Sequence, residues 1–142
     1  MNETLYKFDY PRSIIREYNN WVILLRPAQV TLGALILGHK GNAIRFSEVG
    51  SDAMNELDPI IRSIESTLTK CFAYDKINYQ MLMMVDPHVH FHVIPRYASA
   101  RAYDTVEFID SGWPGLPDLS KDHELTDSTK THLLNYLTTE WV

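Results

Sequence analysis

One segment, from Met83 to Tyr97, constrains this chain more than any other, and it reads MMVDPHVHFHVIPRY. Within it His88, His90 and His92 alternate with apolar residues, namely Val89, Phe91 and Val93. Successive side chains of a β-strand point to opposite faces, so the segment predicts a strand with three imidazoles in a row on one face. Alternate side chains stand roughly 7 Å apart, which is the spacing of neighbouring groups on one small substrate.

Three interpretations of the histidine row compete. The first is a solvent-facing strand whose polar face happens to be histidine. The second is a zinc site, because a His-x-His pair on a strand can hold a metal, although the sequence places no third or fourth ligand. The third is a neutral imidazole that acts as a nucleophile on phosphorus, flanked by imidazoles that bind and protonate. We favour the third.

The segment from His88 to Ile94, HVHFHVI, resembles the signature of the histidine-triad (HIT) family, His-Φ-His-Φ-His-Φ-Φ with Φ apolar. Pro95 and Arg96 continue it in the manner of the diadenosine-polyphosphate hydrolase (Fhit-like) branch. The resemblance extends more weakly from about Ser13 to Tyr97, through the order of strands and one long helix. It implies an α+β, HIT-like fold.

The expected architecture is an antiparallel sheet of about five strands, with one long helix packed across it and a short C-terminal helix. Four strands are expected at residues 13–18, 21–27, 34–38 and 76–85, the last one pairing with the histidine strand. The long helix is expected from Ser51 to Cys71, with Ser51 or Asp52 as its cap. Its apolar stripe has helical period and consists of Ala53, Leu57, Ile61, Ile64 and Leu68.

The rest of the chain completes a single domain that spans residues 1–142. Residues 1–11 are interpreted as an N-terminal arm that packs on the domain. Residues 99–124 are rich in Gly, Pro, Asp and Ser and are expected to form a long surface loop, in which Trp113 covers a site or anchors the loop. Asp127 is expected to cap the C-terminal helix at residues 127–140.

Composition narrows the classes of function. A formal net charge of −5 argues against general binding to nucleic acid. With Cys71 as the single cysteine, the chain can form no intrachain disulfide and no cysteine-based zinc site. No run approaches the ~18 apolar residues of a membrane span, so we expect a cytoplasmic protein without a membrane partner.

The resemblance implies a role for each histidine of the triad. The middle one, His90, attacks the α-phosphorus of a nucleotide, and the backbone carbonyl of His88 holds its other ring nitrogen as a donor. His92 contacts the phosphoryl oxygens or the leaving group, and its protonation raises its acid strength. Water then releases the nucleoside monophosphate from His90, without a metal or another cofactor.

Further candidate residues for substrate binding are Asn78, Arg96 and Arg26. Many relatives place a Gly-rich loop and a Gln, Ser or Thr before the triad, whereas this chain has Met83-Met84-Val85-Asp86. Where the second strand of relatives ends in an Asp or Asn that grips the ribose, the nearest residue here is Arg26. These departures indicate an altered substrate or a slow enzyme. The remaining histidines are expected to be solvated and are His39, His123 and His132.

The predicted function is that of a nucleotide hydrolase or nucleotidyl transferase. It would act at the α-phosphate of a dinucleoside polyphosphate or nucleoside phosphoramidate. The alternatives are a nucleotide-binding module with weak or no turnover, and a histidine-based zinc protein. We also expect a homodimer, formed by the helix from Ser51 to Cys71 and the edge strand near residues 76–81, because the chain has more apolar surface than one small sheet and one long helix can cover.

Overall fold

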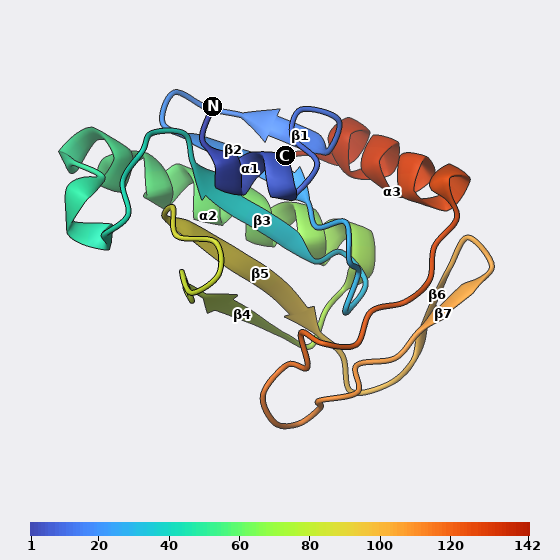
Figure 1. Cartoon of the computed structure of the whole chain (residues 1–142). Helices are drawn as coiled ribbons and strands as arrows, with labels where there is room; N and C mark the ends of the chain where they lie inside the picture. Colours follow the sequence, from blue (N-terminus) through green and yellow to red (C-terminus); the bar gives the residue numbers. More distant parts are fainter.

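The computed structural model describes all residues 1–142 and contains the predicted five-stranded antiparallel sheet. Its strands lie in the order β1-β2-β3-β5-β4, so β1 and β4 are the edges (Figure 1). Their bounds are β1 Ile14–Glu17, β2 Trp21–Leu25, β3 Leu35–His39, β4 Lys76–Gln80 and β5 His90–Arg96. The predicted pairing of the histidine strand with the strand after the long helix is confirmed.

The long helix, α2, spans Ser51–Phe72 and covers one face of the sheet (Figure 1). Its buried residues recur with helical period, and Ile60 is buried where the sequence pattern favoured Ile61. The helix continues through Pro59. Its N-cap is Gly50, which has a φ of 88° and makes no side-chain cap bond, so the prediction of a Ser51 or Asp52 cap is wrong. The glycine permits this backbone turn, which would strain a residue with a Cβ.

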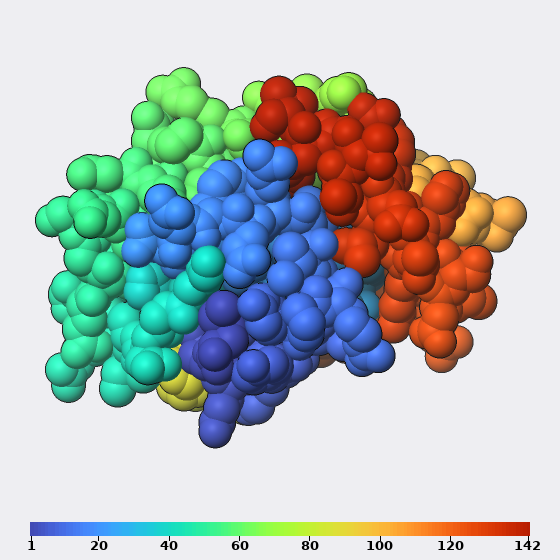
Figure 2. All heavy atoms as spheres, turned by 90° about the horizontal axis from the view of Figure 1, so that it is seen from above, coloured from blue at the N-terminus to red at the C-terminus, as the bar shows by residue number.

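The predicted N-terminal arm contains a short helix, α1 (Glu3–Lys7), on the opposite face of the sheet from α2 (Figures 1 and 2). Asn2 caps it: the side-chain oxygen accepts a hydrogen bond from the Leu5 amide, and its Nδ2 donates to the carbonyls of His39 and Gly41. Leu5 is buried against the sheet and packs with Val22, Leu24 and Ile36. A side chain on Gly38 would collide with Leu5, so this glycine sets how closely α1 approaches β3.

The segment after the main sheet is more ordered than the predicted long loop. Residues 101–108 form a hairpin of β6 (Arg101–Tyr103) and β7 (Val106–Phe108). The final helix, α3 (Asp127–Glu140), has the predicted bounds and lies beside β1 (Figure 1). Its N-cap is Thr126, whose hydroxyl accepts from the Thr129 amide, and not Asp127.

Two strands around the histidine segment are shorter than predicted. β4 ends at Gln80 and β5 begins at His90, so residues 81–89 form a connection between them. Met83 has a φ of 50°, which is incompatible with a regular strand. Pro87 lacks the amide donor that a ladder requires. A further short element is the 3₁₀ helix η1 (Phe46–Glu48). None of the helices has the length and apolar character that a membrane span requires.

Candidate active site

The site is built on β5, where His90 and His92 project from the face that α1 covers. His90 pairs with Gly38 and His92 pairs with Ile36, both on the central strand β3. Both histidines are buried, with exposed fractions of 1% and 7%. Their rings lie 5.1 Å apart, centroid to centroid. The strand thus places two imidazoles side by side, as the alternation predicts.

The ring of His90 is fixed in one tautomer. Its Nδ1 lies 2.6 Å from the backbone carbonyl oxygen of His88. A carbonyl can only accept, so Nδ1 carries the proton and Nε2 keeps its lone pair. This is the contact that the resemblance implied, and it leaves the lone pair of Nε2 free.

His88 precedes β5, so the prediction that all three histidines lie on one strand is wrong. Its ring Nδ1 lies 2.9 Å from the hydroxyl of Thr4, and its backbone amide donates to the same oxygen at 3.3 Å. One hydroxyl can do both, because it accepts from the amide and donates to the ring nitrogen. Helix α1 therefore holds the residue whose carbonyl orients His90.

His92 is held by Arg26, whose Nε donates to its Nδ1 at 3.5 Å. The ring proton consequently resides on Nε2. Burial, together with the neighbouring His90 and Arg26, lowers the pKa of His92 to about 4, and Asp86 acts in the opposite direction. At neutral pH His92 is therefore a neutral hydrogen-bond donor in the chain without substrate.

Two residues of the N-terminal arm complete the site. The ring of Phe8 lies 5.6 Å from that of His90 and 5.9 Å from that of His92, so it covers both imidazoles. Lys7 places its Nζ 2.9 Å from Oδ1 of Asp86, as an ion pair. The carboxylate that would repel a phosphate is thus neutralised by α1.

A pocket of about 220 Å³ opens beside these histidines. Its polar lining consists of Arg26, Asp86, His90 and His92. Its apolar lining comes mostly from the connection before β5, with Leu82, Met83, Met84 and Val85, and from Leu119. The segment Met83-Met84-Val85-Asp86 therefore does line the site, and it contributes thioether and aliphatic groups.

No family model and no curated protein sequence matches the chain, whereas solved structures do. A histidine triad protein from Bradyrhizobium japonicum superimposes with a TM-score of 0.75 at 16% identity, over 100% of this chain and 97% of that one. A Zn-bound histidine triad family protein from Mycobacterium smegmatis gives 0.62 at 17% identity, over 96% and 90%. The chain has the histidine triad fold.

The NitFhit protein of C. elegans is a weaker match, with a TM-score of 0.58 at 17% identity. It covers 88% of this chain and 26% of that longer protein. The fold of the histidine triad proteins is shown, and the assignment to the Fhit-like branch stays a prediction.

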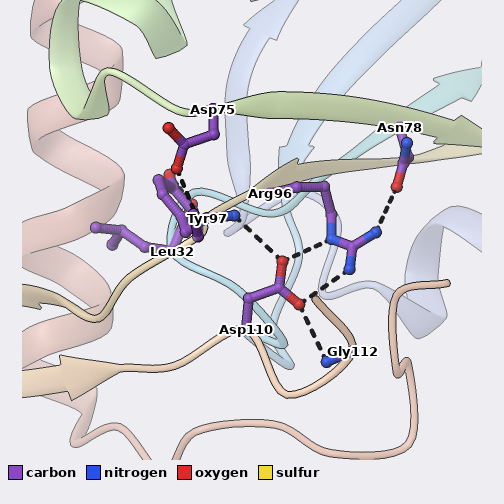
Figure 3. Close-up of polar contacts among 8 residues, drawn as sticks. Leu32, Asp75, Asn78, Arg96, Tyr97, Asp110 and Gly112 are labelled. Carbon is purple, nitrogen blue, oxygen red and sulfur yellow. Dashed lines mark hydrogen bonds and ion pairs between the residues drawn. The ribbon is translucent and has the colours of Figure 1, made fainter. Parts of the chain in front are cut away.

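Asn78 and Arg96 were predicted to bind substrate. They contact each other instead, and neither lines the pocket beside the histidines. Arg96 forms a bidentate ion pair with Asp110, with distances of 2.6 and 3.1 Å, and its Nη1 donates to Oδ1 of Asn78 (Figure 3). Both partners of the ion pair are almost completely buried. Asp110 also accepts from the amides of Tyr97 and Gly112 (Figure 3). A substrate would have to compete with Asp110 for Arg96.

Asn78 and Arg96 line a different space, a groove of about 900 Å³ between β4 and the loop that contains Trp113. This groove shares no residue with the triad pocket. Trp113 accordingly covers the edge of the sheet rather than the histidines.

Gln80 lines the groove beside β4 and not the triad pocket, yet it is a neighbour of His92 that the sequence did not reveal. It pairs with His92 across β4 and β5, so the two side chains share one face of the sheet. Its amide oxygen is buried and has no hydrogen-bond partner. The only sequence signal was its alternation with Asn78, which indicates a shared face but not the partner.

The predictions for the other histidines were partly wrong. His39 is buried and packs edge-on against Trp21, and burial lowers its pKa. His123 bonds through Nδ1 to the carbonyl of Gln29 and accepts at Nε2 from the Ile109 amide, so it fastens the loop before α3. His132 is exposed, 3.6 Å from Asp104.

No group of three or more potential metal ligands converges in the chain. Within the triad, Nδ1 of His90 faces a carbonyl and Nδ1 of His88 faces Thr4, so neither of these two nitrogens is turned toward a shared centre. The zinc interpretation therefore lacks a ligand set.

Proposed function

We propose that this protein is a nucleotide hydrolase or nucleotidyl transferase that acts at the α-phosphate through a nucleotidyl-His90 intermediate. The observation that carries the proposal is the 2.6 Å contact between Nδ1 of His90 and the carbonyl of His88. It leaves the Nε2 lone pair available in a pocket that also contains a second imidazole and a guanidinium. Neutral imidazole is a suitable nucleophile near pH 7.

The proposed reaction has two displacements. In the first, Nε2 of His90 forms a bond to the α-phosphorus, and the bond from phosphorus to the leaving group breaks with its electron pair on the leaving group. In the second, water attacks the same phosphorus, the N–P bond breaks, and the proton of water passes to solvent. The nucleoside monophosphate leaves and neutral His90 is restored.

His92 supports this sequence as a donor. Its Nε2–H hydrogen bonds to a phosphoryl oxygen or to the leaving atom, and its neutral state at pH 7 is maintained by burial and by Arg26. Gln80 lies opposite His92, and its amide group provides a further polar contact on this face. Donors fixed before the reaction stabilise the charge that develops on the phosphoryl oxygens.

The test is turnover by a His90→Ala variant on a panel of dinucleoside polyphosphates and nucleoside phosphoramidates. Release of nucleoside monophosphate should be lost, because no other side chain presents a free imidazole nitrogen to the pocket in this way. His132→Ala, which removes an exposed histidine, is the matched control and should turn over normally. Unchanged turnover by His90→Ala would contradict the proposal.

A trapping experiment tests the intermediate itself. Substrate labelled at the α-phosphorus is mixed with the protein and quenched in alkali, in which a phosphoramidate survives. Label should remain on the wild-type chain and be absent from His90→Ala. Turnover without trapped label, at several quench times, would support direct attack by water.

A nucleotide-binding module with weak turnover is the second candidate. The pocket of about 220 Å³ is smaller than the ~300–1,000 Å³ typical of ligand sites, and Phe8 covers the nucleophile. Calorimetry with AMP and ADP, combined with the turnover assay, separates the two functions. Binding without product supports the module, and a lack of binding by any nucleotide contradicts both.

A further inference from the structure

The chain contains two deeply buried arginines with opposite electrostatic surroundings. Arg96 is 4% exposed and is compensated by the bidentate carboxylate of Asp110. Arg26 is 8% exposed and takes part in no ion pair. A buried charge without a counter-ion is unfavourable, and proteins retain such groups where they bind a ligand of opposite charge.

The hydrogen bonds of Arg26 leave part of its guanidinium unused. Nη1 donates to the Ala28 carbonyl at 2.6 Å, and Nε donates to Nδ1 of His92 at 3.5 Å. Nη2 donates to nothing in the protein. A guanidinium has five N–H donors in a planar fork, so several remain available to an oxyanion.

Arg26 lines the triad pocket. Arg26 follows β2, and its side chain reaches across β3 to contact His92 and line the pocket. Burial lowers the pKa of Arg26, and Asp122 is the one acid that acts against this shift, from beyond ion-pair distance. The other nearby acid, Asp86, is paired with Lys7.

We propose that Arg26 is an anion receptor, and that the substrate presents to it a second anionic phosphoryl group beside the one that His90 attacks. This inference rests on the proposed function for the position of the attacked phosphorus. A guanidinium supplies donors only, so it matches phosphoryl oxygens and does not match a ribose diol in the way that an acceptor carboxylate does.

Substrates with an anionic group on each side of the pocket are therefore selected over those with neutral hydroxyls beside the attacked phosphate. The bound phosphoryl group also serves as the counter-ion of Arg26, which has none within the protein. Residues 83–86 do not form the Gly-rich phosphate-binding loop that many relatives have. The guanidinium of Arg26, at the end of the second strand, takes over the binding of phosphate.

Pyrophosphate is the probe, because it carries two linked phosphoryl groups and no nucleoside. Its affinity is measured by calorimetry, and by the rise in Tm with concentration at constant ionic strength maintained with sodium chloride. Wild-type protein should bind it, and Arg26→Gln should weaken its affinity at least tenfold. Arg26→Lys, which retains the charge without the fork, should lie between the two.

Arg16→Gln is the matched control, since it removes one exposed positive charge from the neighbouring strand β1. It should bind pyrophosphate as wild type does, which excludes a simple effect of net charge. Circular dichroism and the Tm without ligand verify that each variant is folded. If Arg26→Gln does not fold, the comparison of Arg26→Lys with wild type carries the test, with a loss of affinity of at least threefold expected.

The inference is overturned if wild-type protein does not bind pyrophosphate, or if the folded Arg26 variants bind it as tightly as wild type. Failure of the proposed function is detected separately. His90→Ala retains Arg26 and should still bind pyrophosphate, so loss of turnover with retained binding tests the nucleophile independently of the anion receptor.

Discussion

The hydroxyl oxygen of Thr4 lies 2.9 Å from the ring Nδ1 of His88 and 3.3 Å from its backbone nitrogen. Thr4 belongs to α1, whereas His88 belongs to the connection before β5, 84 residues later in the chain. Because the carbonyl of His88 orients the ring of His90, a residue of the N-terminal arm acts on the proposed nucleophile through one intermediate.

Replacing Thr4 with Val, which has a similar shape, should lower kcat/KM about three- to tenfold, since the net value of one hydrogen bond is about 0.5–1.5 kcal/mol. Thr4→Ser retains the hydroxyl and should restore most of the activity. Equal losses in both variants would indicate a packing role for the methyl group instead.

The ion pair between Lys7 and Asp86 determines the sign of charge near the pocket entrance. Lys7→Ala leaves the Asp86 carboxylate facing an anionic substrate and should raise KM severalfold at low salt. Asp86→Asn removes the repulsion and should lower KM. Both effects should diminish as ionic strength rises, because salt screens partly exposed charges. Steady-state kinetics at two salt concentrations measure them, and a salt-independent change would argue against electrostatics.

The low pKa of His92 links folding stability to pH. The folded-state pKa of about 4 is below the ordinary 6.5, so the unfolded chain binds the proton more readily. His92 therefore costs no stability above pH 6.5, and stability decreases as the pH falls from 6.5 toward 4, by up to about 3 kcal/mol.

His92→Gln should have a smaller loss of unfolding free energy between pH 7 and pH 4.5 than wild type. Urea unfolding at the two pH values measures it. His39 titrates with the same sign and remains in both proteins, so the difference between them isolates His92. Identical pH dependence in the two proteins is the result that contradicts the assignment.

Replacing Arg96 with Leu should destabilise the fold by about 3–5 kcal/mol, because it leaves the carboxylate of Asp110 buried and unpaired. Arg62→Leu breaks an exposed pair with Asp58 and should change stability by less than about 1 kcal/mol. The free energy of unfolding in urea distinguishes them. If Arg96 instead binds substrate, Arg96→Leu will raise KM even under conditions in which the variant remains folded.

We also predict a homodimer, with a mass about twice 16.4 kDa by light scattering. The apolar stripe of α2 is used against the sheet, so the interface is expected at the free edge of β4. Exposed apolar residues gather in the flanking segments and include Met84, Val85 and Leu116. Leu116→Asp, which changes the groove beside β4, should weaken the dimer. A mass near 16.4 kDa that does not rise with concentration would contradict it.

Local periodicity in the sequence was sufficient to predict the main elements. The period of two at His90 and His92 predicted a strand and a shared face, and the apolar stripe predicted α2. The bounds of α3 also followed from local signals. Helix α1 did not, because five residues have no readable period and their helix depends on Asn2 and on burial of Leu5.

The parts of the site that sequence reasoning missed depend on contacts between distant segments. The partner of Gln80 is set by the β4–β5 register across residues 81–89, whose length alone does not determine it. The contact of Arg26 with His92 joins residues 66 positions apart, and Asp110 approaches Arg96 from a segment interpreted as loop. Such pairings follow from the packing of the whole chain, which no local pattern encodes.

Gly38 contributes no side chain to the candidate site, yet it lies opposite His90 and beneath Leu5. One added methyl group there would lift α1 from the sheet, and Thr4 and Phe8 would move with it. The spacing between α1 and the histidines of the candidate site therefore depends on the absence of a Cβ at one position of the central strand. An alanine at this position would therefore disturb both the packing of Leu5 and the placement of the candidate site.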